Sequence, residues 1–165
     1  VSLLPAATYH VFLNNLFASI LVFRNLRNQQ VGASSTCRKD SGIDEILVAE
    51  KETEGRGIPW GEVHGIPTLD GELNQFTWKD KALVLFLSNV VQNGQEVIRK
   101  RRRGPAGDSA AKRAVRQVFG PDTRKDLSIP RANDEYNHKM NGVDVSDEMR
   151  LYYQYGHPIR RGGWQ

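Results

Sequence analysis

The chain has 165 residues, of which 39% are hydrophobic and 25% are charged, and its formal net charge is +4. This length and composition are typical of one globular domain with its own core, and no apolar run approaches the roughly 20 residues of a membrane helix, so we expect no membrane partner. The single cysteine, Cys37, excludes an internal disulfide and a cysteine-based zinc cluster within these residues.

The N-terminal part alternates strand-like and helix-like segments. Residues 8–15 (TYHVFLNN) mix β-branched and aromatic side chains and predict a short buried strand. Residues 16–29 place apolar side chains at helical spacing and predict an amphipathic helix. Residues 31–42 are typical of a strand end that passes into a loop. Residues 39–60 are polar and lack periodicity, so they predict a long exposed connection.

The next part predicts a small meander. Asp70-Gly71 lies between two strand-like runs, which is a strong hairpin signal, and Lys79-Asp80-Lys81 predicts a second turn. The run 82–91 (ALVLFLSNVV) begins with continuous apolar residues, as in a central strand buried on both faces. Strands combined with helices predict a mixed α/β or α+β fold, that is, a mixed sheet with helices.

Positive charge is concentrated between residues 99 and 125, where ten basic residues stand against two acids. This asymmetry predicts that one face or arm meets an anion. The run 99–103 fits three interpretations: a solvated surface, a nuclear import signal or a phosphate-binding patch. Because adjacent like charges repel, we expect the segment 99–125 to be mobile without a partner, apart from a short helix over 108–119 capped by Asp108 or Ser109.

Two acids near the C-terminal end allow two interpretations. Residues 133–140 predict a helix that stops at Asn141-Gly142, because glycine accepts the left-handed conformation there. Asp144 would then be the N-cap of a second helix. Alternatively, Asp144 and Asp147, at i and i+3, share a helix face and hold a divalent cation. The local sequence leaves both interpretations open.

Several strings, in order, resemble the transposase domain of the piggyBac type, most closely its fungal members. They are YHVFLNNLFAS, GASSTCR, TWKDKALVLFLSN, VFGPDTRKDLSIP, YNHKMNGVDVSDEMR and YGHPIRRGGWQ. The resemblance implies an RNase H-like fold and metal-dependent DNA cleavage and strand transfer, with Mg²⁺ or Mn²⁺ held by carboxylates from distant positions. It also implies a nuclear location, DNA as partner (transposon ends or non-specific duplex), a homodimer in the full-length family and no small-molecule substrate.

The resemblance also implies site residues. The third catalytic aspartate falls on Asp144 and a supporting one on Asp147. The second falls on Asp80, although other members carry the acid after the strand, where this chain has Asn89, Val90 and Val91. The first position, the Asp of a D-N-x-F string, is Asn14 here. A neutral amide cannot bridge two cations as an anion, so we expect Asp80, Asp144 and Asp147 as metal ligands and impaired catalysis.

The domain over residues 1–165 is expected to be truncated at both ends and therefore incomplete. The residues predicted to contact DNA are Arg99, Lys100, Arg101, Arg102, Arg103, Arg160 and Arg161. The alternative function is a non-enzymatic DNA-binding or interaction module, or a transposon remnant without selected function.

Overall fold

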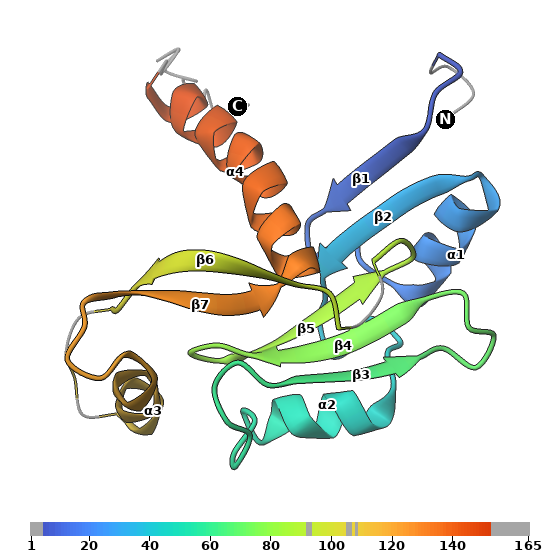
Figure 1. Cartoon of the computed structure of the whole chain (residues 1–165). Helices are drawn as coiled ribbons and strands as arrows, with labels where there is room; N and C mark the ends of the chain where they lie inside the picture. The colour runs from blue at the N-terminus through green and yellow to red at the C-terminus, as the bar shows by residue number, and fades with distance from the viewer. Residues whose placement is uncertain (1–4, 92–93, 105–106, 108, 153–165) are drawn as a thin grey trace, which may run out of the picture.

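A computed structural model describes residues 5–91, 94–104, 107 and 109–152. They form a five-stranded sheet with three helices against it, and a two-stranded ribbon that carries a fourth helix at its far end (Figure 1). In chain order the elements are β1 (Tyr9–Leu13), α1 (Ile20–Asn28), β2 (Val31–Thr36), α2 (Glu45–Glu52), β3 (Val63–Pro67), β4 (Asn74–Lys79), β5 (Leu83–Ser88), β6 (Glu96–Arg102), α3 (Ala110–Phe119), β7 (Arg124–Pro130) and α4 (Arg131–Tyr152).

The sheet has the strand order β1-β2-β5-β4-β3. β1 and β2 are parallel and the other neighbours are antiparallel. Both predicted hairpins are confirmed: Asp70-Gly71 lies between β3 and β4, with Gly71 at a φ of 69°, and the turn at Asp80 joins β4 to β5. At the edge of the sheet, β1 pairs with β2 alone among the described strands.

β5 lies at the centre of the sheet and is buried on both faces, as its apolar run predicts. On one face Leu85 and Leu87 pack with Phe23 of α1 and Leu47 of α2. On the other face Phe86 packs with residues at the start of α4, including an edge-on contact with the Tyr136 ring at 5.6 Å between centroids. The sheet is therefore covered by α1 and α2 on one side and by α4 on the other.

α2 replaces the long exposed connection expected over residues 39–60. Asp44 caps it, because its Oδ1 accepts a hydrogen bond of 2.9 Å from the Ile46 amide. Leu47 is fully buried, whereas Ile46 is 62% exposed. Only one side chain of this short helix is buried, so the sequence lacks the repeated apolar spacing that marks a longer amphipathic helix.

α4 corrects the prediction of two helices separated by a stop. It runs unbroken from Arg131 to Tyr152, through Asn141-Gly142, so Asp144 is not the N-cap of a second helix. A glycine inside a helix costs only about 1 kcal/mol relative to alanine, which the rest of a long helix offsets. Neither α4 nor any other helix in the described ranges is both long and apolar enough to cross a membrane.

Candidate nucleic-acid interface and the predicted acidic site

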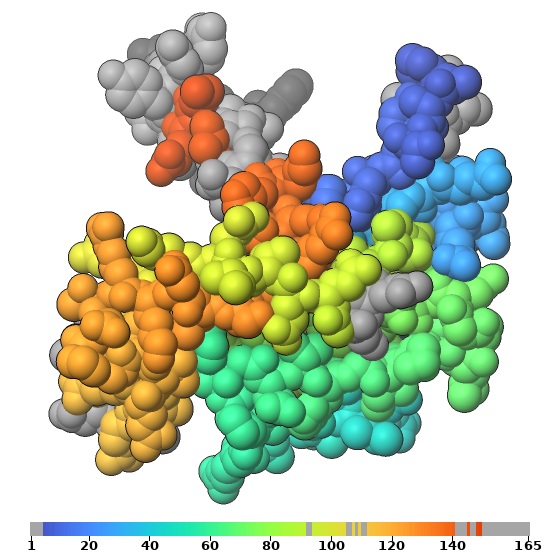
Figure 2. All heavy atoms as spheres, viewed as in Figure 1, coloured from blue at the N-terminus to red at the C-terminus, as the bar shows by residue number. Residues whose placement is uncertain are grey.

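The basic segment 99–125, expected to be mobile, lies partly in regular elements: the end of β6, all of α3 and the start of β7. β6 and β7 form an antiparallel ribbon in which Lys100 is opposite Asp126 and Arg102 is opposite Arg124. A strand directs successive side chains to opposite faces, so it separates the charges that a flexible segment would hold together. Figure 2 shows β6 (yellow-green) and β7 (orange) at the surface of the molecule.

The inner face of the ribbon packs on the rest of the chain. Leu127 of β7 is buried in a cluster with Val115 and Phe119 of α3, and Trp60 lies against them. Two arginines of β6 project from this same face, Arg99 and Arg101, and each pairs with an aspartate of another element.

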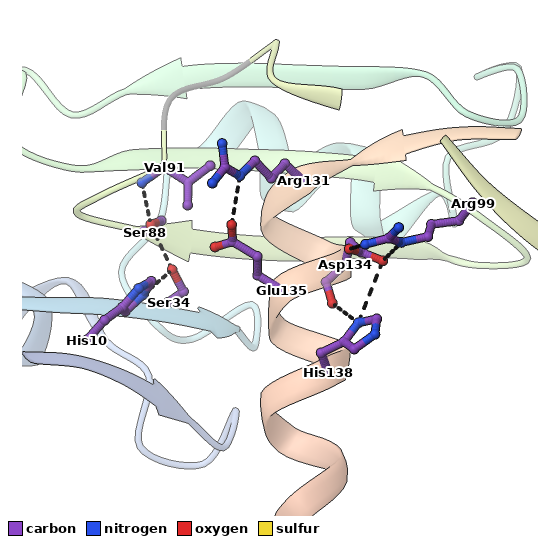
Figure 3. Close-up of polar contacts among 9 residues, drawn as sticks. All are labelled: His10, Ser34, Ser88, Val91, Arg99, Arg131, Asp134, Glu135 and His138. Atoms are coloured by element: carbon purple, nitrogen blue, oxygen red, sulfur yellow. Dashed lines mark hydrogen bonds and ion pairs between the residues drawn. The ribbon is translucent and has the colours of Figure 1, made fainter. Parts of the chain in front are cut away.

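Arg99 anchors the ribbon to α4. Its Nε and one terminal nitrogen donate to the two carboxylate oxygens of Asp134 at 2.8 and 2.7 Å (Figure 3). The Asp134 residue is 8% exposed, whereas the Arg99 side chain is 49% exposed. The hydrogen bond from Arg99 lowers the pKa of Asp134 below its usual range. Arg99 is therefore engaged within the chain.

Arg101 holds the β4–β5 turn in the same way. Its guanidinium donates to Asp80 Oδ2 at 2.9 Å and lies 5.8 Å from the centroid of the Trp78 ring. The other carboxylate oxygen of Asp80 accepts a hydrogen bond of 3.0 Å from the Trp60 indole. Both oxygens of this predicted metal ligand thus bind donors of the chain itself.

The outer face of the ribbon carries basic side chains that, among the described residues, form no ion pair. Lys100, Arg102 and Arg124 are exposed on this face, and none of their side chains has a hydrogen-bond or ion-pair partner in the part of the chain that the structure describes. Arg103, beyond the strand end, donates to the Gly120 carbonyl at 3.0 Å.

The predicted DNA-contacting set is thereby divided. Lys100 and Arg102 are exposed on the outer face. Arg99 and Arg101 are engaged in ion pairs, and Arg103 binds the Gly120 carbonyl. Arg160 and Arg161 lie outside the described residues. Sequence reasoning missed Arg124, which joins the outer face only through its cross-strand pairing with Arg102.

Asn14 follows directly on β1 and is exposed. Its side-chain oxygen accepts a hydrogen bond from the Leu16 amide at 3.1 Å and its carbonyl accepts one from the Phe17 amide at 3.0 Å, so Asn14 shapes a turn.

α4 reaches this end of β1, where the Tyr136 hydroxyl donates to the Leu13 carbonyl at 3.2 Å. Asp144 and Asp147 belong to α4, with Asp144 about 12 Å further along its axis than Tyr136. Their side chains lie outside the described part.

Asp80 does not share a pocket with Asn14. Leu13 is level with Ser35, Leu87 and Gln75 across the sheet. Asp80 follows β4, which is three strand spacings from β1 across the sheet. Along the strand direction it lies about four residues beyond the level of Asn14. The two residues are therefore roughly 20 Å apart. Among the described residues no three His, Cys, Asp or Glu side chains gather as metal ligands would. The described donors do not fit the predicted two-metal site, whose ions lie about 4 Å apart.

A buried polar chain crosses the sheet at the other end of β1 (Figure 3). His10 Nε2 lies 3.0 Å from Ser34 Oγ, which lies 2.9 Å from Ser88 Oγ, and Ser88 Oγ accepts from the Val91 amide at 3.0 Å. Burial lowers the pKa of His10. Both serines are fully buried, so this chain links β1, β2 and β5 and offers no accessible nucleophile.

Comparison with known families decides the affiliation. The family model described as "Transposase IS4" matches residues 2–165. The chain belongs to this family. No curated protein matches it.

The fold of this transposase-family domain is similar to a solved structure, the cryo-EM structure of a piggyBac transposase synaptic complex with hairpin DNA. The TM-score is 0.56 at 19% identity, over 88% of this chain and 24% of that one. The predicted piggyBac-type affiliation and the mixed α/β, RNase H-like fold are confirmed. The domain spans about a quarter of the piggyBac transposase chain.

Proposed function

We propose that this piggyBac-type domain binds DNA through the outer face of the β6–β7 ribbon. The observation that carries the proposal is the division of the basic run: the inner arginines pair with Asp134 and Asp80, while Lys100, Arg102 and Arg124 remain exposed together on one face. Three exposed cations on neighbouring positions of one ribbon face can bind the phosphates of a nucleic-acid backbone. A two-stranded ribbon is also narrow enough to enter the major groove of B-DNA.

The test is DNA affinity as a function of salt concentration. We would compare the native chain with a ribbon variant, Lys100→Ala/Arg102→Ala/Arg124→Ala, by fluorescence anisotropy on a labelled duplex. A matched control removes the same charge from exposed positions elsewhere, with Arg27→Ala/Arg38→Ala/Lys39→Ala. Circular dichroism checks that each variant is folded.

We expect the ribbon variant to bind more weakly at every duplex sequence. Each lost phosphate contact removes about 0.9 from the slope of log affinity against log salt, so the slope should fall by about 2 to 3. The control variant should keep most of the slope. Equal losses in the ribbon and control variants would contradict the proposal, because total charge would then explain the binding.

We also propose that the ancestral reaction, metal-dependent DNA cleavage and strand transfer with Mg²⁺ or Mn²⁺, is impaired in this chain. The neutral Asn14 supports this, because an amide cannot replace an anionic ligand that bridges two cations. We keep Asp144 and Asp147 as the proposed acidic residues and assign Asp80 to anchoring the ribbon. The test is cleavage of terminal-repeat DNA by Asn14→Asp, with Asn15→Asp as the neighbouring control. Robust cleavage by the native protein would refute impairment.

A non-enzymatic DNA-binding module is the second candidate, favoured by the same exposed ribbon face. It predicts that Asp144→Asn leaves DNA affinity and its salt slope unchanged, whereas a retained catalytic role predicts the loss of any measured strand cleavage. A nuclear location and a homodimer are further proposals that rest on the family resemblance. Imaging of a fluorescent fusion and light scattering test them.

A further inference from the structure

A second basic surface lies on the other side of the ribbon end. A hollow of about 260 Å³ opens between the β4–β5 turn, the end of β6 and the start of α3. Four cations line it, namely Lys81, Arg103, Lys112 and Arg116, and Val115 of α3 contributes an apolar wall. Arg103 follows the end of β6 and donates to the carbonyl of Gly120, the residue after Phe119, which packs on the inner face of the ribbon. This hollow is therefore distinct from the surface proposed above.

A second hollow meets the first at Lys81. An adjacent hollow of about 530 Å³ shares Lys81 and adds Arg56 and Lys79. It is also lined by Ala114, so both hollows border α3 and they meet at Lys81. We call the pair the α3 groove.

The α3 groove is strongly positive. Six cations line it, and Glu54, the one acid among its described lining residues, pairs with Lys51 at 3.4 Å. Lys81, Lys112 and Arg116 have no carboxylate partner within the described ranges. Asp108, which precedes Ser109 in the sequence, lies outside the described residues. A surface with this excess of positive charge attracts a polyanion.

Two glycines let lysine side chains lie against the backbone of the groove. A Cβ on Gly104 would be 3.0 Å from Lys81 Nζ, and a Cβ on Gly107 would be 2.5 Å from Lys112 Nζ. Lys81 Nζ thus lies close to Gly104, and Lys112 Nζ lies close to Gly107. Among the described residues that line the groove, none is an aromatic residue on which a base would stack.

We propose that the α3 groove binds the phosphodiester backbone of DNA as a second contact, separate from the outer face of the ribbon. Cations without aromatic side chains match phosphates rather than bases, so the contact is independent of sequence. The inference rests on the proposed DNA-binding function and adds a second surface to it.

The first arm of the test is a groove variant, Lys81→Ala/Lys112→Ala/Arg116→Ala. It is compared with the ribbon variant, the combination of both and the control variant Arg27→Ala/Arg38→Ala/Lys39→Ala. We expect the groove variant to lower the salt slope by about 2 to 3 and the combined variant to lower it further. A groove variant that matches the control would overturn the inference while the ribbon result stands. Absence of salt-dependent binding by the native chain would instead refute the proposed function.

The second arm maps the groove directly. Acetylation of lysines in the native chain, with and without duplex DNA, is quantified by mass spectrometry, and Lys39 serves as the internal reference. We expect DNA to protect Lys81 and Lys112 severalfold relative to Lys39. Inorganic phosphate and pyrophosphate at matched ionic strength distinguish a DNA backbone from a free anion. Protection by these ions without protection by DNA would overturn the assignment.

Discussion

Arg99 and Asp134 join the ribbon to α4 through two hydrogen bonds of 2.8 and 2.7 Å, although 35 positions separate them in the sequence. The ribbon forms a sheet of its own, so its position relative to the five-stranded sheet depends on this pair, on Arg101 with Asp80, and on the apolar contacts of α3. The same contacts decide which cations of the basic run remain exposed to solvent.

Replacing Asp134 should destabilise the protein measurably. Asp134→Asn removes the charge from a nearly buried hydrogen-bonded group, and the half-exposed Arg99 can be rehydrated, so we expect a loss of about 1 kcal/mol in the free energy of unfolding. Urea denaturation measures it. The neighbouring Glu135→Gln breaks an exposed pair with Arg131 and should cost less than about 0.5 kcal/mol. Equal losses in both variants would mean that Asp134 has no special role.

The same aspartate predicts an acid dependence of stability. Its pKa is lowered in the folded protein by Arg99, so the unfolded chain binds its proton first as the pH falls. The stability it contributes is present above about pH 4, the ordinary value of an aspartate, and is lost as the pH falls through the folded value. Denaturation midpoints at pH 5, 4 and 3 should fall less steeply for Asp134→Asn than for the native chain. Parallel curves would contradict the link.

His10 should make the stability of the protein depend on pH in a second range, closer to neutral. Burial, mainly, and Lys139 lower its pKa, while Glu135 opposes them. The neutral ring is therefore favoured by folding, and its contribution is present above about pH 6.5 and lost as the pH falls through the folded value. We expect the denaturation midpoint to decline from pH 7 to pH 5 and His10→Gln to reduce that decline. His138→Gln, a control that keeps His10, should retain it.

The packing of α2, a helix that was not predicted from the sequence, can be tested by mutation. Leu47 is fully buried and Ile46 is 62% exposed on the same helix. Leu47→Ala should cost about 2 to 5 kcal/mol through lost packing and a cavity, whereas Ile46→Ala should change stability by less than about 0.5 kcal/mol. Chemical denaturation of both variants checks the difference. Similar costs would show that α2 does not pack as described.

The elements found from sequence were those with strong local chemistry. Asp70-Gly71 marks a tight turn, the apolar run of β5 marks a central strand, and Ser109 caps α3 by accepting a hydrogen bond from the Lys112 amide at 3.3 Å. α2 was missed because Leu47 alone is buried. The stop at Asn141-Gly142 was predicted from the preference of glycine for helix ends, but a glycine also continues a helix at a modest cost.

The site was less accessible to sequence reasoning because its contacts are between distant residues. Nothing near Asp80 shows that Arg101 and Trp60 bind it, since both lie about twenty positions away. The run 99–103 was treated as one charged block, whereas strand alternation divides it between a solvent face and an ion-paired face. Asn14 was placed correctly at the end of a strand, but its distance from Asp80 follows only from the strand order.

β1 has a consequence for handling the protein. β1 is an edge strand, and on its outer edge, from Tyr9 to Phe12, the backbone amide and carbonyl groups pair with no other described strand. An unpaired edge strand of this kind can form backbone hydrogen bonds with an extended segment of another chain. Concentrated samples of this chain should therefore form intermolecular β-structure, and a proline placed in this strand should keep them monodisperse.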